Sequence, residues 1–125
     1  MRFFKKPWFQ RFAEKEGISD DDLKALVAEM EAGTIHASLG GYVYKQRLAR
    51  KGAGKSGGYR TLLFFRSGER VFFMYAFTKS DRANITQREL VALKDAAKVY
   101  MEMTPAQLAI ALKAHELVEF YEGTP

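Results

Sequence analysis

The stretches Tyr59–Phe65 (YRTLLFF) and Val71–Phe77 (VFFMYAF) flank the dipeptide Ser67-Gly68. Both are rich in aromatic and aliphatic residues that favour β-strands, and Ser-Gly is typical of a turn. The sequence therefore predicts two strands joined by a short connection. The second stretch is apolar on both faces, which is typical of a central strand covered from both sides.

Two further segments precede this pair of strands. Tyr42–Leu48 (YVYKQRL) is rich in β-forming residues, and its alternation places Lys45 and Arg47 on one face. Between this strand and Tyr59 lies Arg50–Gly58 (RKGAGKSGG), which contains four Gly and no large apolar side chain. We expect a mobile loop there, ordered by RNA through its lysines.

Helices are predicted on both sides of the β region. Apolar residues recur at helical spacing over Lys6–Lys15, and again from Ser19 to about Gly33. Two further helices are predicted at the end of the chain, the last one carrying His115 on an apolar face and reaching Val118. Helix starts are marked by Pro7, Ser19, Thr86 with Glu89, and Thr104 with Pro105. We therefore predict one α+β domain over residues 1–125, with two N-terminal helices, an antiparallel sheet and two C-terminal helices.

Positive charge is concentrated in the middle of the chain. The net charge is +5, and no acidic residue occurs between Ala32 and Ser67. A cluster of this kind favours a polyanionic partner such as nucleic acid, although a solvated basic surface is the alternative. The seven basic residues in this segment are Lys45, Arg47, Arg50, Lys51, Lys55, Arg60 and Arg66.

Composition excludes several classes of protein. With no Cys, the chain has no disulfide, no cysteine-based metal site and no catalytic thiol. No apolar run reaches the length of a membrane span, and Met1–Gln10 lacks the apolar stretch of a signal peptide. We expect a cytoplasmic protein that uses neither a metal nor a cofactor.

The residues that remain for chemistry are mostly cations. The string Gly52–Ser56 (GAGKS) ends like a phosphate-binding loop, but the required first Gly and the following helix are missing. Lys55, Arg60, Lys79 and Arg82, with Tyr59 and Tyr75 nearby, are expected at one end of the sheet. Such cations bind phosphates and stabilise a phosphoryl transition state. RNA supplies its own 2′-hydroxyl nucleophile, so cleavage and phosphate binding alone are both open.

These motifs resemble a known family. Gly54–Arg60 (GKSGGYR), Thr61–Phe65 and Val71–Ile85 (VFFMYAFTKSDRANI) together are similar to the RelE/ParE toxin superfamily, in its RelE/HigB branch. The resemblance implies a fold like that of small microbial ribonucleases. It also implies a toxin of a type II toxin–antitoxin pair, which enters the ribosome, cleaves mRNA and is neutralised by an antitoxin protein.

The resemblance also assigns roles to individual residues. By position, the family's catalytic cations match Arg60, Lys55, Lys79 and Arg82, and its C-terminal acid or base leaves His115 and Tyr121 as candidates, of which we expect His115 to be structural. Two alternatives stay open: a ParE-like inhibitor of DNA gyrase that cuts no RNA, and a plain nucleic-acid-binding domain. Contacts to RNA or the ribosome are expected from Lys45, Arg47, Arg50, Lys51 and Arg66.

Overall fold

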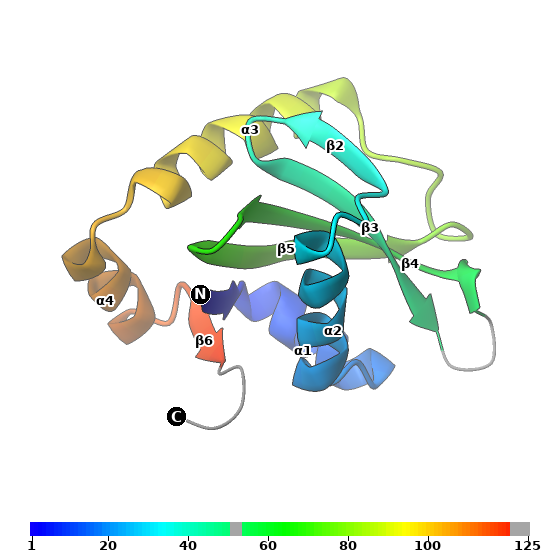
Figure 1. The fold of residues 1–125 in the computed structure, drawn as a ribbon, viewed down its shortest axis with the longest axis horizontal. Helices are drawn as coiled ribbons and strands as arrows, with labels where there is room; N and C mark the ends of the chain where they lie inside the picture. The colour runs from blue at the N-terminus through cyan, green and yellow to red at the C-terminus, as the bar shows by residue number, and fades with distance from the viewer. Residues whose placement is uncertain (51–53, 121–125) are drawn as a thin grey trace.

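The structure, a computed structural model, describes residues 1–50 and 54–120. Within these ranges the chain forms four helices and a six-stranded mixed sheet of order β2-β3-β4-β5-β1-β6, which confirms the α+β class (Figure 1). In chain order the elements are β1 (Arg2–Lys5), α1 (Pro7–Glu16), α2 (Asp20–Glu31), β2 (Ala37–Gly40), β3 (Val43–Arg50), β4 (Gly54–Arg66), β5 (Arg70–Thr78), α3 (Gln87–Glu102), α4 (Pro105–Lys113) and β6 (Val118–Phe120).

The helices begin where the cap residues predict. The Ser19 side chain accepts a hydrogen bond from the backbone N–H of Asp22, whose carboxylate accepts one from the Ser19 N–H. Thr86 with Glu89 forms the same reciprocal box at the start of α3. These bonds satisfy donors that a helix N-terminus leaves free. The starts of all four predicted helices are therefore confirmed.

The central strands form an antiparallel meander, as predicted. Residues of β4 pair with β3 on one side and with β5 on the other, and Ser67-Gly68 lies in the turn between β4 and β5. The predicted loop Arg50–Gly58 is mostly wrong, because β4 already begins at Gly54, which pairs with Arg50. Glycines lack the side chains that signal a strand, but their backbone groups bond to a neighbouring strand equally well.

Three short strands, β1, β2 and β6, escaped the sequence analysis. β1 runs parallel to β5, with Phe4 opposite Phe72, so the sheet is mixed rather than wholly antiparallel. β6 pairs with the other edge of β1. The predicted last helix is too long, because α4 ends at Lys113 and Val118 belongs to β6. His115 lies in the intervening turn, exposed and with a left-handed φ of 59°, and not on an apolar helix face.

Each face of the sheet has its own helical cover (Figure 1). On one face, Phe65 and Phe73 pack with Phe9 of α1 and with the apolar residues of α2. On the other face, Phe64 and Phe72 pack beneath α3 and α4. Burying one such side chain contributes about 2 kcal/mol. Neighbouring residues of β4 and β5 therefore serve different cores, and β5 is the predicted strand covered on both sides. No helix in the described residues has the length and apolarity that crossing a membrane requires.

Candidate functional site

Tyr59 and Arg60 are neighbours in β4 whose side chains lie on opposite faces of the sheet. Tyr59 is buried on the face covered by α1 and α2, and its hydroxyl donates to Glu16 at 2.9 Å. Burial is the main cause that raises the pKa of the Tyr59 hydroxyl, and the Glu16 carboxylate adds to it. Arg60 shares the α3 face with Leu62 and Phe64, because side chains alternate along a strand. Tyr59 is therefore not part of the site, although its sequence position suggested it.

The Arg60 guanidinium has a hydrogen-bonding defect. Its Nη1 atom is buried and has no hydrogen-bond partner in the part of the chain that the structure describes. Arg47 stands directly opposite Arg60 in the ladder between β3 and β4. Like charges at directly opposite positions are destabilising, and an unpaired buried donor is costly. A bound anion would relieve both unfavourable terms, which makes this position a candidate phosphate site.

Arg82 differs from Arg60 because its guanidinium is fully engaged. Its two terminal nitrogens donate to the two carboxylate oxygens of Glu89, at 3.0 and 2.5 Å, and its Nε donates to the Asn84 carbonyl at 3.0 Å. The hydrogen bond from Arg82 is the main cause that lowers the pKa of Glu89 from 4.5 to about 2. The guanidinium also lies over the ring of Phe77, the residue opposite Arg60 in β5. Arg82 is thus held beside Arg60, with its charge balanced by Glu89.

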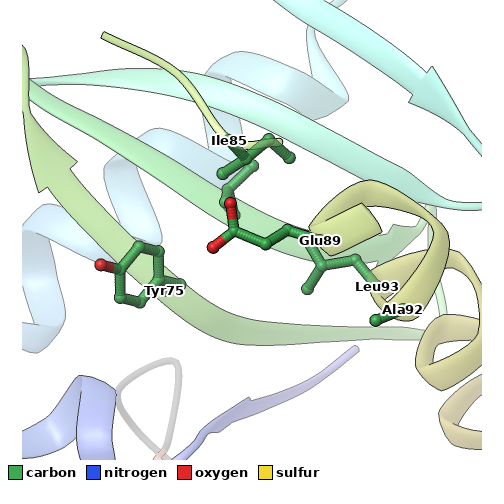
Figure 2. Close-up of a pocket in the computed structure, with 6 residues that line it drawn as sticks. Tyr75, Ile85, Glu89, Ala92 and Leu93 are labelled. Carbon is green, nitrogen blue, oxygen red and sulfur yellow. The ribbon is translucent and has the colours of Figure 1, made fainter. Parts of the chain in front are cut away.

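A pocket of about 260 Å³ opens beside this ion pair. Tyr75 and Leu62 supply its floor from the sheet, while Ile85 and Glu89 border it from the start of α3. In Figure 2, Glu89 extends from α3 over the sheet between Ile85 and Tyr75. The neighbouring Tyr75 hydroxyl is the second cause, after the hydrogen bond to Glu89, that raises the pKa of Arg82. The pocket therefore presents a carboxylate and a phenol, and the Arg82 guanidinium binds that carboxylate.

A comparison with known families assigns the chain. A family model described as the RelE toxin of the RelE/RelB toxin–antitoxin system matches residues 1–120. The chain belongs to the RelE toxin family. It is therefore a toxin of a toxin–antitoxin system, a class whose members pair with antitoxins. No curated protein sequence matches the chain.

Other residues expected at the site lie close to it. In this RelE toxin, Lys45 stands opposite Leu62, on the face of Arg60, and its Nζ donates to Asn84 Oδ1 at 3.2 Å. Lys79 is exposed in the turn after β5, two residues beyond Phe77, the partner of Arg60. The expectation that Arg60 and Lys79 share one end of the sheet is therefore confirmed.

The remaining candidates in the toxin are dispersed. Arg50 lies over the ring of Tyr59, on the opposite face, and Arg66 lies six residues along β4 from Arg60. His115 follows α4, at the left of Figure 1, whereas the β3–β4 hairpin that carries Arg60 reaches to the right. Lys51, Tyr121 and the side chain of Lys55 lie outside the described residues.

Sequence reasoning missed the contribution of Glu89 to the site. Glu89 stands three positions after Thr86, where a capping box alone accounts for a glutamate. Its carboxylate does accept a hydrogen bond from the Thr86 N–H at 2.7 Å. The same carboxylate also binds Arg82, seven residues earlier in the chain. Only the path of residues 79–86 brings the two together, and no spacing rule encodes that path.

Proposed function

We propose that this RelE toxin is a ribosome-dependent endoribonuclease that cuts mRNA at a phosphate bound by Arg60. The observation that carries the proposal is the buried Nη1 of Arg60, which has no partner among the described residues, in a residue that stands opposite Arg47 in the ladder. A phosphodiester would accept from the free N–H and would offset the repulsion between the two cations. The membership in the RelE family supports RNA as the source of that phosphate.

The proposed reaction is transesterification within the RNA strand. The 2′-hydroxyl releases its proton to solvent as its oxygen attacks the neighbouring phosphorus. The bond to the 5′-oxygen breaks, that oxygen takes up a proton, and a 2′,3′-cyclic phosphate and a 5′-hydroxyl result. Negative charge grows on the phosphate oxygens as the bonds change. Arg60 stabilises this charge best, because its N–H is already in place and desolvated. Lys79 and Lys55 complete the cationic surroundings in this proposal.

Tyr75 is our candidate for the group that protonates the leaving 5′-oxygen. Its position in β5 is diagonal to Arg60, a relation in which Cα atoms lie about 7–8 Å apart and long side chains meet. The hydroxyl lies close enough to Arg82 to contribute to the raised pKa of the guanidinium, and a neutral phenol has an O–H to donate. Arg82, itself fixed by Glu89, would act by positioning Tyr75. This arrangement would replace the C-terminal acid that the resemblance implied.

The other basic residues are proposed to contact RNA or the ribosome. Lys45 and Arg47 flank Arg60 on β3 and would bind neighbouring phosphates of the mRNA. Arg50 and Arg66 are assigned to the ribosome, because the sheet separates Arg50 from Arg60 and the length of β4 separates Arg66 from it. Lys51 is assigned with them because it belongs to the same basic stretch of sequence. The cognate antitoxin would neutralise the toxin by covering this basic surface.

In vitro translation with mapping of mRNA 5′ ends tests the function. Wild-type toxin should produce new ends within translated mRNA, and Arg60→Ala should not. Tyr75→Phe retains the ring that packs at a tilt against Trp8, with the ring centroids 4.6 Å apart, so a lower kcat with an altered pH profile would report the lost proton. If translation leaves mRNA intact while purified toxin blocks supercoiling by DNA gyrase, the gyrase-inhibitor alternative replaces our proposal.

A further inference from the structure

A second cationic pocket, of about 370 Å³, lies well away from the candidate cleavage site. Arg66 at the end of β4 borders it, six residues from Arg60, which corresponds to about 20 Å along a strand. Lys94 and Lys98 approach from α3, and Gly41 and Tyr42 close it from the turn before β3. One scissile phosphate cannot reach both Arg60 and this pocket, so the pocket needs an occupant of its own.

The charges of this pocket are incompletely balanced. Lys94 and Lys98 stand one helical turn apart, where like charges repel. Both are exposed, and neither has an ion pair among the residues that the structure describes. Arg66 donates to Glu69 at 3.3 Å, and Glu102 is the carboxylate in the pocket wall. Three cations thus face two carboxylates, an excess that an anion would balance.

The backbone of the turn is held in an unfavourable conformation that shapes the pocket. Gly40, Gly41 and Tyr42 have consecutive positive φ angles of 87°, 59° and 67°. Glycine adopts this region freely, but a bulky residue such as tyrosine rarely does. The result is that the exposed Tyr42 ring lies under the Arg66 guanidinium at 4.7 Å, with its hydroxyl accepting from Arg66 at 3.0 Å. Strain of this kind occurs at binding sites, where it fixes a side chain in position.

We infer that the pocket formed by Tyr42, Arg66, Lys94 and Lys98 binds a backbone phosphate of ribosomal RNA and anchors the toxin on the ribosome. The inference rests on the proposed function and names a second contact of the same complex. Flexible lysines and a fixed Arg–Tyr pair suit a phosphodiester, whose ribose or base can lie against the exposed aromatic ring. An acidic segment of the antitoxin fits less well, because protein partners depend on buried apolar anchors, and Met101 is the aliphatic side chain in the pocket wall.

The test compares Lys94→Gln/Lys98→Gln with Lys15→Gln/Lys113→Gln, which removes two exposed lysines from α1 and α4. Both pairs are made in an Arg60→Ala background, so that mRNA remains intact during the measurement. Affinity for purified ribosomes is measured from about 50 to 200 mM salt. We expect roughly tenfold weaker binding at low salt for the pocket variant, and a salt slope lower by about one to two. The control should bind more tightly than the pocket variant and with a steeper slope.

Each outcome decides between occupants. Equal affinity and slope for the two double variants would overturn the inference. So would selective binding of inorganic phosphate at the lysines with unchanged ribosome affinity, which would indicate a small phosphate ligand. Loss of antitoxin affinity alone would assign the pocket to the antitoxin. If Arg60→Ala still cleaves mRNA while the pocket variant loses ribosome affinity, the proposed cleavage site fails and the anchor stands. If the wild-type toxin does not bind ribosomes, the proposed function fails. Weaker binding of the pocket variant to protein-free ribosomal RNA would then still support a phosphate site in this pocket.

Discussion

Tyr59 and Arg60 occupy adjacent positions in one strand, yet their surroundings are opposite in kind. Tyr59 is buried under α1 and α2, and its hydroxyl has a partner in Glu16. Arg60 is directed to the α3 face, with a second arginine opposite and a buried nitrogen that lacks a partner within residues 1–50 and 54–120. The side of β4 that faces α1 and α2 is built for stability. The other side, at this end of the strand, keeps an unfavourable arrangement that a ligand would relieve, as functional sites commonly do.

The largest effect on cleavage is expected from a substitution of Arg60. Arg60→Ala should lower the rate of mRNA cleavage by about 100-fold or more, because a pre-positioned donor to the phosphate is lost. The melting temperature should stay equal or rise, since the change removes a buried unpaired N–H and the repulsion with Arg47. Cleavage is measured by mapping mRNA ends, and unfolding by circular dichroism. Arg11→Ala, which removes an exposed arginine of α1, is the control for lost charge. A folded Arg60→Ala toxin with full activity would contradict the assignment.

A smaller effect is expected where the cation already has a partner. Glu89→Gln should lower cleavage by about tenfold, because Arg82 loses its charged bidentate partner and holds Tyr75 less firmly. An amide oxygen still accepts the capping bond from Thr86, so α3 should form normally. A mere capping role for Glu89 would leave both the cleavage rate and its pH profile unchanged.

Glu89→Gln should also change how the stability of the toxin depends on pH. The pKa of Glu89 is lowered from 4.5 to about 2 by the hydrogen bond from Arg82. A lowered pKa stabilises the fold fully above the unfolded value and loses that effect as pH falls through the folded value. The stability advantage of the wild type over Glu89→Gln should therefore be complete above pH 4.5 and vanish towards pH 2. Melting temperatures across this range measure it, and a difference that does not depend on pH would exclude the ion pair as its cause.

A substitution at Tyr59, on the face covered by α1 and α2, should change the stability of the toxin but not its activity. Tyr59→Phe should reduce the free energy of unfolding by about 1 kcal/mol, the typical value of one hydrogen bond, because Glu16 loses its donor. Cleavage should be unchanged, since Tyr59 lies on the opposite face from Arg60. Urea unfolding and end mapping on the same preparation check both halves. Reduced cleavage at full stability would place Tyr59 in the site after all.

Local signals in the sequence predicted the parts of the fold that local physics determines. Caps at Ser19, Thr86 and Thr104 act within one turn of helix, and the continuous apolar run Val71–Phe77 indicates a strand buried on two faces. β1 has four residues, and its pairing with β5 depends on a chain segment about 70 positions away. Its sequence, RFFK, is too short to show a strand period, and two of its four residues are charged.

In the site, too, the sequence predicted what neighbouring residues determine and missed what depends on contacts distant in the chain. The sequence predicted that Arg60 and Lys79 share one end of the sheet, because a hairpin fixes both. It also placed Tyr75 near these cations, and Tyr75 lies two residues before Phe77, the partner of Arg60. It did not predict the pairing of Arg82 with Glu89, because that depends on how α3 crosses the sheet. The sequence shows only that the basic residues from Lys45 to Arg66 are close along the chain. In the structure Arg50 lies on the opposite face of the sheet from Arg60, and Arg66 lies six residues away along β4.

The smallest expected effect concerns His115, which the sequence offered as a candidate acid. It is exposed in the turn after α4, with a φ of 59° that costs a non-glycine residue about 1 kcal/mol. His115→Gly should relieve this strain but should lose chain entropy in folding, for a net stabilisation of about 0.5 kcal/mol or less. The backbone bond from its N–H to Leu112, at 3.1 Å, does not depend on the side chain. Cleavage should be unchanged in His115→Gly and also in His115→Gln, which retains a polar side chain. Loss of the chemical step in both folded variants would make His115 the proton donor and remove Tyr75 from that role.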